Sequence, residues 1–441
     1  MGELNAADTA WMLVATALVL LMTPALALFY GGLVRSRNVL STFMHSFFAL
    51  GLVTLQWIVI GYTLVFAPSH GGIIGGLDFL GFQGVGLEPK GSIPHILFAG
   101  YQMMFAVITP ALISGAFAER MKFSAYVLFT VLWALFVYDP IAHWVWGPGG
   151  WLSARGALDF AGGTVVHLSA GLSALVMACM LGRRDGFPHR RMPPHNLTMT
   201  LLGAGLLWFG WFGFNAGSAL KADGIAALAL VNTHIAAALG ALAWASIEWV
   251  RHGKPSTLGV ASGLVAGLVA VTPAAGFVGP MASAGIGFLA GVTCYLGVLL
   301  KHRFSYDDAL DAFGVHGIGG ALGAILTGVF ASTYWNPKGA QGLWYGNVGL
   351  FNEQLFSVVV SGVYAASATF FIAKAVDWAI GLRPAIHIEQ EGLDLMLHGE
   401  QAYGDAVSSR AYEDEPQQSA QEKPLTSIEM PVSAVHLLPE P

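Results

Sequence analysis

The stretch DFAGGTVVHLSAG, from Asp159 to Gly171, places an aspartate before a run of small and apolar residues and a histidine, His167, inside it. An apolar run of about 20 residues is long enough to cross the hydrocarbon core of a membrane as a helix. Ionisable side chains inside such spans are costly, and they commonly mark a substrate pathway or a proton relay. The stretch therefore predicts a transmembrane helix that carries a functional group.

The composition of the whole chain agrees with a membrane protein. Of 441 residues, 55% are hydrophobic and 10% are charged, against about 25% charged in soluble domains. The 56 glycines, among them the pairs Gly263–Gly267 and Gly319–Gly323, suit helices that pack backbone to backbone in lipid. The formal charge of −6 is spread over loops and indicates no nucleic-acid partner. Both cysteines lie in apolar runs, so we expect no disulfide framework.

Eleven apolar runs are each long enough to span a membrane as a helix, which predicts an all-α integral membrane protein. They are residues 10–34, 41–67, 94–118, 123–146, 160–182, 197–218, 224–250, 258–278, 281–300, 309–332 and 353–380. No small-residue cleavage site follows the first run, so we expect it to remain as the first helix rather than act as a signal peptide.

The orientation follows from the positive charges between the spans. Thirteen Lys and Arg residues follow the odd-numbered spans and four follow the even-numbered spans. Because cytoplasmic loops carry the excess of Lys and Arg, the N-terminus is predicted outside and the C-terminus in the cytoplasm. The alternation also supports the count of eleven, since one missed span would exchange the two sets downstream.

A second histidine occupies a matching place. His167 lies about 12 Å below Asp159 along a helix, and His316 lies about 7.5 Å past Asp311. Both positions are near the membrane midplane. The pattern V-H-x-x-[AG]-G surrounds each histidine, and we take Asp311, expected to be structural, as the counterpart of Asp159.

Each histidine ends a set of five spans, which is an odd number. The second set must therefore be inserted upside down relative to the first. The sequence predicts two inverted repeats, about 10–182 and about 197–332, followed by a final helix at about 353–380. In such folds the substrate path lies near the midplane, where the repeats meet.

A single histidine in a membrane span is often a satisfied structural residue, but two at matching depth favour a shared site. Burial in hydrocarbon favours the neutral imidazole, which suits a small polar molecule or a proton. Two histidines without further ligands make a poor metal site. No nucleophile, base and orienting group converge on one place. We therefore expect no metal, no cofactor and no enzymatic activity.

Long motifs in order along the chain resemble the ammonium transporter family (Amt/MEP/Rh), and within it the Amt branch. The resemblance runs from Ala10 to about Tyr403. Its motifs are ALALFYGGLVRSRNVL, FAVITPALISGAFAERMKFSA, PIAHWVWG, DFAGGTVVHLSAG with LGRR, GWFGFNAGSAL, DDALDAFGVHGIGG and EGLDLMLHGEQAY.

The resemblance implies a homotrimer with one conduction path in each protomer and ammonium or ammonia as substrate, with methylammonium as an analogue. An ammonium recruitment site would comprise Trp146, Ser218 and Phe105. Phe105 and Phe214 would form a gate, and the pore histidines would lie below it. An aromatic face attracts a cation, and a serine oxygen accepts a hydrogen bond from ammonium.

Three further residues are expected to support the site. Tyr101 corresponds to a second aromatic position of the vestibule. Trp211 supports the vestibule, although Trp146 and Trp211 taken singly would also fit an interfacial aromatic belt. Asp159 is a good N-cap for its helix, and the resemblance adds an electrostatic or proton-releasing role near the recruitment site.

The implied mechanism is deprotonation of ammonium near the gate and passage of ammonia along His167 and His316. A charged ion is expensive to bring into an apolar passage, whereas neutral ammonia is not. The proton would return outside or cross by a relay that includes the imidazoles. An ammonium sensor on the same scaffold and an Rh-type ammonia or carbon dioxide channel are the alternatives.

The chain divides by composition after the last span. Residues 1–382 form the predicted transmembrane domain in the cell membrane, surrounded by lipid. Residues 383–404 resemble the family's cytoplasmic regulatory segment, and a PII-type signalling protein is the implied partner on that face. Residues 405–441 have the low hydrophobicity of a disordered tail.

Overall fold

The computed structural model describes residues 3–403, and the predicted tail at 405–441 lies outside the described residues. The first part of the chain contains α1 (Ala6–Leu33), η1 (Ser36–Asn38), α2 (Val39–Gln56), η2 (Trp57–Gly61), α3 (Tyr62–Phe66), η3 (Leu80–Phe82), α4 (His95–Phe117), α5 (Phe123–Trp133), η4 (Ala134–Tyr138), α6 (Asp139–Trp146), α7 (Trp151–Ala154), η5 (Gly163–Leu168) and α8 (Ser169–Leu181). The second part contains α9 (Leu197–Gly217), α10 (Gly224–His252), α11 (Thr257–Val271), α12 (Pro280–Phe304), η6 (Phe313–Gly317), α13 (Ile318–Phe330), η7 (Leu343–Tyr345), α14 (Val348–Ile380), α15 (Ile386–Glu391) and η8 (Asp394–His398).

Ten helical segments among residues 3–403 are long and apolar enough to cross a membrane, and the eleventh predicted span is a shorter apolar helix, α11. The prediction of a span over 258–278 is therefore too long, because α11 ends at Val271. Pro273 follows two residues later and has no backbone N–H to continue the helix. Hydropathy misses this end because the turn that follows is itself apolar.

Polar residues mark the starts of α1, α9, α10, α11 and α14. The side-chain oxygen of each accepts a hydrogen bond from a backbone N–H in the first turn, which would otherwise lack a partner. These capping residues are Asn5, Asn196, Asp223, Ser256 and Asn347. The segment Asn196–Met199 illustrates the geometry, with the Asn196 side chain 2.9 Å from the Met199 nitrogen.

Glycine lets the helices of the second half approach closely. A Cβ added to Gly263 would collide with the Gly240 carbonyl, and one added to Gly267 would collide with Ala236. Gly323 meets the backbone of Ala270 in the same way. The predicted small-residue packing is thus present between α10 and α11 and between α11 and α13.

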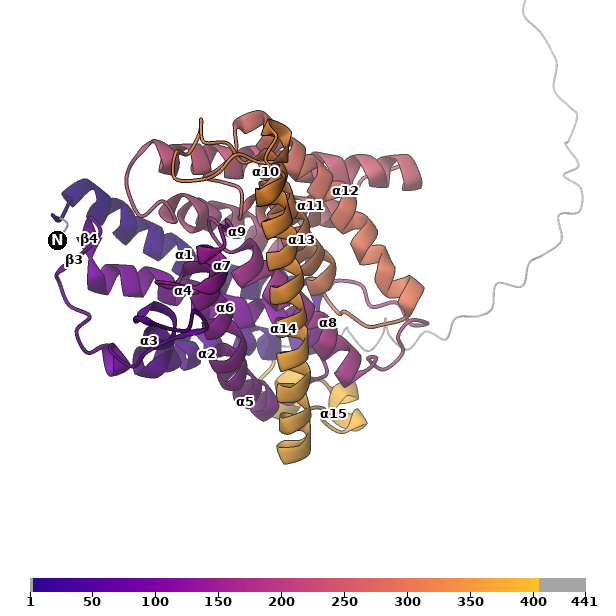
Figure 1. Cartoon of the computed structure of the whole chain (residues 1–441). Coiled ribbons are helices and arrows are strands. Elements are labelled where there is room, and N and C mark those ends of the chain that lie inside the picture. The colour runs from indigo at the N-terminus through magenta and orange to yellow at the C-terminus, as the bar shows by residue number, and fades with distance from the viewer. Residues whose placement is uncertain (1–2, 404–441) are drawn as a thin grey trace, which may run out of the picture. The chain divides into compact units, whose positions relative to one another are not determined.

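The helices form a bundle in which the two predicted repeats interlock. Helix α1 packs along α9, and α10 packs on α11 and α12. Helix α14 runs across the bundle and contacts both α8 and α13 (Figure 1). The two five-span sets therefore share one core, and the final helix covers their junction.

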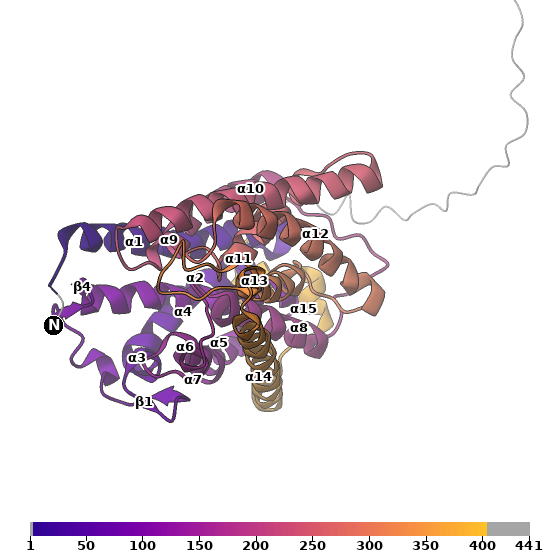
Figure 2. The same cartoon turned by 45° about the horizontal axis from the view of Figure 1, so that its top comes forward.

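Two small hairpins interrupt the helices between α3 and α4. Strand β1 (Ser69–His70) pairs antiparallel with β2 (Ile74–Gly75), and β3 (Pro89–Lys90) pairs with β4 (Ile93–Pro94). In Figure 2, β4 lies beside the start of α1, where the Asn5 nitrogen donates a hydrogen bond to the Ser92 carbonyl. This connection is folded onto the bundle rather than left as an open loop.

The segment after α14 packs against the start of α2 and the end of α8. Asp394 accepts hydrogen bonds from the backbone nitrogens of Leu40 and Ser41 and so caps α2 from a distant part of the chain. Arg383 forms an ion pair with Glu389 and donates a hydrogen bond to the Leu181 carbonyl at the end of α8. One compact unit extends to Ala402 and includes this segment.

Buried ion pairs join the loops that follow α1, α4, α8 and α12, so they link the two repeats. Glu119 pairs with Arg35 and Arg184, and Arg184 also pairs with Asp307. Burial raises the pKa of Glu119, but the two guanidinium groups outweigh burial and lower that pKa to about 2. Glu119 therefore stays ionised, as a buried carboxylate with two cationic partners should.

Candidate functional site

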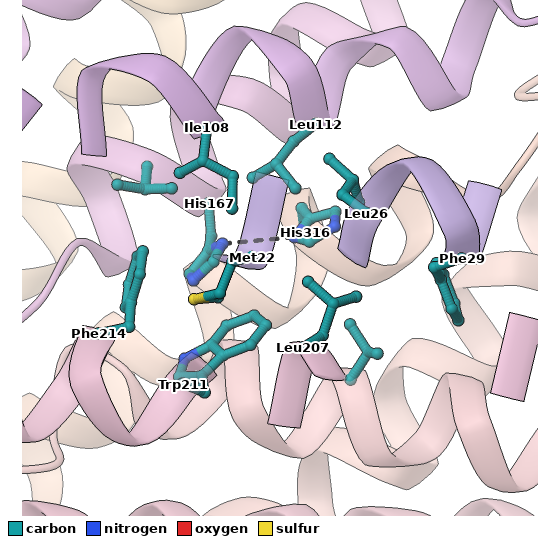
Figure 3. Close-up of a pocket in the computed structure, with 12 residues that line it drawn as sticks. Met22, Leu26, Phe29, Ile108, Leu112, His167, Leu207, Trp211, Phe214 and His316 are labelled. Atoms are coloured by element: carbon teal, nitrogen blue, oxygen red, sulfur yellow. Dashed lines mark hydrogen bonds between the residues drawn. The ribbon is translucent and has the colours of Figure 1, made fainter. Parts of the chain in front are cut away.

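The two predicted pore histidines are buried and lie side by side in the pocket drawn in Figure 3. Their Nδ1 atoms are 3.3 Å apart, and the ring centroids are 5.4 Å apart with an interplanar angle of 21°. A hydrogen bond between two Nδ1 atoms requires one ring to donate and the other to accept. The neutral pair is therefore made of two different tautomers.

Each histidine lies in a π-helical turn, η5 for His167 and η6 for His316. Such turns are rare and frequently occur at functional sites. The two segments contact each other reciprocally: Gly171, four residues after His167, meets Gly317, and Gly320, four residues after His316, meets the His167 segment. A side chain at either glycine would force the segments apart and separate the rings.

A narrow apolar passage surrounds the histidine pair. Its residues come from both repeats: Met22, Leu26, Phe29, Ile108, Leu112, Val166, His167, Leu207, Trp211, Phe214, Val265 and His316. The cavity volume is about 10 Å³, at the lower limit of the roughly 10–15 Å³ that one water molecule needs. The passage thus admits one very small molecule at a time.

Past His316 the passage widens. A second cavity of about 220 Å³ shares Phe29, Val265 and His316 with the first. Lys301 and Asp311 line its far side and form an ion pair there. This side of the histidine pair therefore opens into a cavity with charged walls.

On the other side, aromatic rings close the passage. The Phe105 and Phe214 rings are 4.3 Å apart, and each side chain is 1% exposed. The Phe214 and His167 rings are 5.9 Å apart, and Trp211 lies against His167 at 5.4 Å. The structure thus brings the two predicted gate residues together and places Phe214 against the first histidine.

Trp146 and Ser218 lie above this pair of phenyl rings and are both half-buried. The Trp146 ring is 5.8 Å from that of Phe105. The Ser218 hydroxyl donates to the Phe214 carbonyl, which leaves its oxygen lone pairs as acceptors. An aromatic face and a hydroxyl oxygen therefore meet at the entrance, here named the Trp146 end.

Tyr101 is fully buried beneath this entrance and has no exposed surface. Its hydroxyl lies 3.0 Å from the Gly213 carbonyl, 2.9 Å from the Phe214 carbonyl and 3.3 Å from the Ser218 oxygen. These contacts tie α4 to the end of α9. Tyr101 accordingly holds Ser218 and Phe214 in place rather than lining the entrance.

Asp159 caps the His167 segment. Its carboxylate accepts hydrogen bonds from four backbone nitrogens, at Gly162, Gly163, Thr164 and Val165, and from the Thr164 hydroxyl. The Asp159 carbonyl accepts the indole N–H of Trp146 at 3.0 Å. One residue thus fixes both the turn that carries His167 and the orientation of Trp146.

The counterpart of Asp159 is Asp308, so the assignment of Asp311 to that role is wrong. Asp308 accepts hydrogen bonds from the Ala312 and Phe313 nitrogens at the start of η6. Both capping aspartates stand eight residues before their histidine, in DFAGGTVVH and DALDAFGVH. Asp311 instead has a φ of 62° and turns its carboxylate to Lys301.

Sequence reasoning missed Asp308 and the apolar wall of the passage. Counting the distance from aspartate to histidine in both repeats would have found Asp308. No such signal marks Ile108, Leu112, Leu207 or Val265, because apolar residues that face a pore have the same composition as those that face lipid or the core.

Within the described part of the chain, no group of three or more His, Cys, Asp and Glu residues could hold a metal ion. Neither cysteine lines the passage. Cys179 is exposed, and Cys294 is buried, where its thiol donates a weak hydrogen bond to the Val315 carbonyl. The chemistry of the passage therefore rests on imidazole, aromatic and aliphatic groups.

Known proteins resemble this chain along most of its length. The sequence model of the Ammonium Transporter Family matches residues 10–403. An ammonium transporter of Bacillus subtilis is 54% identical over 405 residues, which cover 91% of this chain and 99% of that protein. The crystal structure of Saccharomyces cerevisiae Mep2 matches with a TM-score of 0.81 and 38% identity, covering 87% of this chain and 91% of that one. A structure titled Sensor Amt Protein matches with a TM-score of 0.83 and 27% identity, covering 88% and 97%.

Proposed function

Because this chain belongs to the ammonium transporter family and transports ammonium across a membrane, we propose that its conduction path runs from the Trp146 end past His167 and His316 into the cavity at Lys301. The observation that carries this proposal is the hydrogen-bonded histidine pair in an apolar passage of about 10 Å³. Neither a charged ion with its hydration shell nor a larger solute fits such a space.

Recruitment takes place at Trp146 and Ser218, with Phe105 as the floor. A cation gains about 0.5–2 kcal/mol from an aromatic face, more as it loses water. Ser218 offers a hydroxyl oxygen whose own proton is already donated to the Phe214 carbonyl. The site therefore favours a small cation with N–H donors over one without them.

Ammonium loses its proton before the Phe105–Phe214 rings, and ammonia continues. The penalty for taking an ion into an apolar interior is several kcal/mol even after relaxation. Ammonia avoids that penalty, but it needs partners that accept from its N–H groups and partners that donate to its lone pair. The buried Nε2 of His167, which has no partner within residues 3–403, supplies one of them.

The proton has two routes. It returns to the side of recruitment, so that transport carries no net charge, or it crosses along the linked imidazoles, so that each cycle carries one charge. The differing tautomers of the pair support the second route, because a proton that enters one ring can leave through the other.

Current measurements on proteoliposomes test the proposal. The protein is placed on a solid-supported membrane and given a jump in ammonium, with an equal jump in potassium and protein-free liposomes as controls. An ammonium-specific current supports charge transfer through the path. Internal alkalinisation without current supports conduction of neutral ammonia. Ammonium binding without current or alkalinisation would contradict the path and favour a sensor.

Orientation, membrane and assembly are part of the same proposal. The excess of Lys and Arg after odd-numbered spans supports an outer N-terminus and a cytoplasmic C-terminus in the cell membrane. The resemblance to the family supports a homotrimer and a PII-type partner on the cytoplasmic face. We assign transport to residues 1–382, without covalent catalysis, and regulation to residues 383–404. Native mass spectrometry tests the trimer.

A further inference from the structure

Lys90 in β3 places its ammonium group among four aromatic rings, away from the conduction path. Its Nζ atom lies 4.6 Å from the centroid of Phe98, 5.4 Å from Phe66, 5.5 Å from Tyr62 and 5.7 Å from Phe79. Cation–π attraction operates up to about 6 Å, so all four rings contribute. We name this group of rings the Lys90 cage.

Hydrogen bonds complete the cage. The ammonium donates to the Tyr62 hydroxyl at 3.1 Å, and the Tyr62 hydroxyl is hydrogen-bonded to His95 Nε2. The ammonium also lies 3.5 Å from the same His95 nitrogen. When Nε2 is unprotonated, it and the Tyr62 oxygen are both acceptors beside the ammonium, which suits a charged lysine.

No carboxylate within residues 3–403 forms an ion pair with Lys90, in contrast to Lys301 with Asp311. The ring faces, the Tyr62 hydroxyl and the His95 imidazole take the place of the usual counter-ion. Burial lowers the pKa of Lys90 to about 8, which still leaves the side chain mostly protonated at neutral pH. The cage thus holds an ammonium group with the same kinds of partners that Trp146 and Ser218 offer to a free one.

The cage fastens three parts of the chain. Tyr62 and Phe66 belong to α3, Phe79 to the connection after it, and Phe98 to the first turn of α4. Phe98, Tyr101 and Phe105 follow at spacings of three and four residues and share one face of α4. Phe105 lies about 10 Å along the helix from Phe98. A shift of α4 at the cage would therefore move the gate ring.

We propose that the Lys90 cage is a recognition site for primary alkylammonium groups, which the chain fills with its own lysine, and that the seated lysine positions α4 and its gate residue Phe105. The binding part stands on the cage geometry alone, and the positioning part rests on the proposed function of Phe105.

Chemical rescue tests the binding part. Lys90→Ala removes three carbons and the nitrogen beyond Cβ, which n-propylammonium replaces. We expect Lys90→Ala to lower the apparent Tm by about 2–4 °C and millimolar n-propylammonium to restore most of that loss. n-Propanol should restore little of it, and n-propylammonium should leave the wild type and Lys338→Ala, an exposed lysine variant, unchanged. An equal response of Lys338→Ala, or no rescue of Lys90→Ala, would overturn the site.

A measurement on the wild type covers the case in which Lys90→Ala does not fold. Reductive dimethylation followed by mass spectrometry gives the labelling rate of each lysine. We expect enclosure by the rings to make Lys90 react more slowly than Lys338 although its lowered pKa leaves more free amine, and Phe98→Leu, which removes the nearest ring, to raise the Lys90 rate. An unchanged Lys90 rate in Phe98→Leu would overturn the cage.

Ammonium flux tests the positioning part. Lys90→Met should reduce flux several-fold, Lys90→Arg should retain most of it, and n-propylammonium should restore flux to folded Lys90→Ala. Wild-type flux in the same liposomes separates this proposal from the conduction path, since a failed path gives no wild-type flux. Full flux in Lys90→Met at a lowered Tm would reject the positioning role and leave the binding site intact.

Discussion

The segments around His167 and His316 are built alike but face different surroundings. Both histidines lie in π-helical turns capped by an aspartate eight residues earlier. Yet His167 lies under the Phe105–Phe214 rings, whereas His316 borders a cavity of about 220 Å³. The repeat therefore supplies the paired imidazoles, and residues outside the repeated motif supply the difference between the two sides.

The caps differ as well. Asp159 receives five hydrogen bonds and also holds Trp146 through its carbonyl. Asp308 receives two and lies close enough to Asp311 for their charges to interact. The cap beside the Trp146 end is thus more fully hydrogen-bonded than the cap next to the open cavity.

The largest expected effect comes from removing either histidine. Because one hydrogen bond joins them, His167→Ala and His316→Ala each leave the other ring without its buried partner, a cost of roughly 1–3 kcal/mol. We expect either change to reduce ammonium flux by about tenfold or more, or to admit potassium, measured in proteoliposomes. The histidine pair is symmetric in this respect, so the two variants should behave alike.

A histidine outside the passage provides the control. His234 in α10 stacks on Trp208 at 5.2 Å, does not line the passage, and His234→Ala should leave flux unchanged. Unchanged ammonium flux and unchanged discrimination against potassium in His167→Ala would contradict the role of the pair.

Removing each of the two capping aspartates should lower the stability of the protein by a different amount. Each buried donor left unpaired costs about 1–3 kcal/mol, so Asp159→Ala should lower the apparent Tm more than Asp308→Ala. Asp159→Asn, which keeps one acceptor oxygen, should fall between wild type and Asp159→Ala. Thermal unfolding in detergent measures the order. If Asp308→Ala lowered the apparent Tm more than Asp159→Ala, the two hydrogen bonds of Asp308 would stabilise the fold more than the five of Asp159.

Much of this architecture could be predicted from hydropathy and charge. The order of the helices, the paired histidines and the contact of Phe105 with Phe214 follow from the spans together with the family resemblance. The π-helical turns could not be predicted, since GTVVHL and FGVHG contain nothing that distinguishes them from α-helix. The two segments that carry them meet at Gly171 and Gly320, a contact that the local sequence does not reveal.

The end of α11 and the function of Tyr101 also required the structure. Hydropathy counts apolar residues and does not register that a chain turns within an apolar run, as it does after Val271. Aromatic type alone does not show whether a ring lines a vestibule or is buried beneath it, and Tyr101 is buried. The pairing of Asp311 with Asp159 is wrong because Asp308, not Asp311, shares with Asp159 the spacing of eight residues to its histidine.

The two capping aspartates should also differ in how protein stability depends on pH. Burial, with the neighbouring Asp311 carboxylate, raises the pKa of Asp308 from 3.8 to about 6. A carboxyl group whose folded pKa is raised favours the fold while it is protonated, and this contribution is lost as pH rises through that range. Asp308→Asn should therefore gain stability relative to wild type between pH 4 and pH 7. Each tenfold difference in proton affinity between the folded and unfolded states corresponds to about 1.4 kcal/mol, which thermal unfolding at a series of pH values detects.

The control is Asp159→Asn, which should show no such gain because it breaks a network of five hydrogen bonds. Comparing each variant with wild type at the same pH removes the titration of the other carboxylates. A constant difference between Asp308→Asn and wild type over this range would contradict a raised pKa at Asp308.

The smallest expected effect lies at the Lys301–Asp311 pair, where the two sides of the passage differ most. The side chains are 14% and 31% exposed, and ion pairs open to solvent contribute about 0–1 kcal/mol. Lys301→Met should therefore change ammonium flux by less than about threefold. Asp311→Asn, chosen because asparagine tolerates the positive φ, completes a double-mutant cycle with it. If Lys301→Met reduced flux as much as His316→Ala, the charge at Lys301 would control conduction through the cavity, and the asymmetry between the two sides would be one of charge rather than of width.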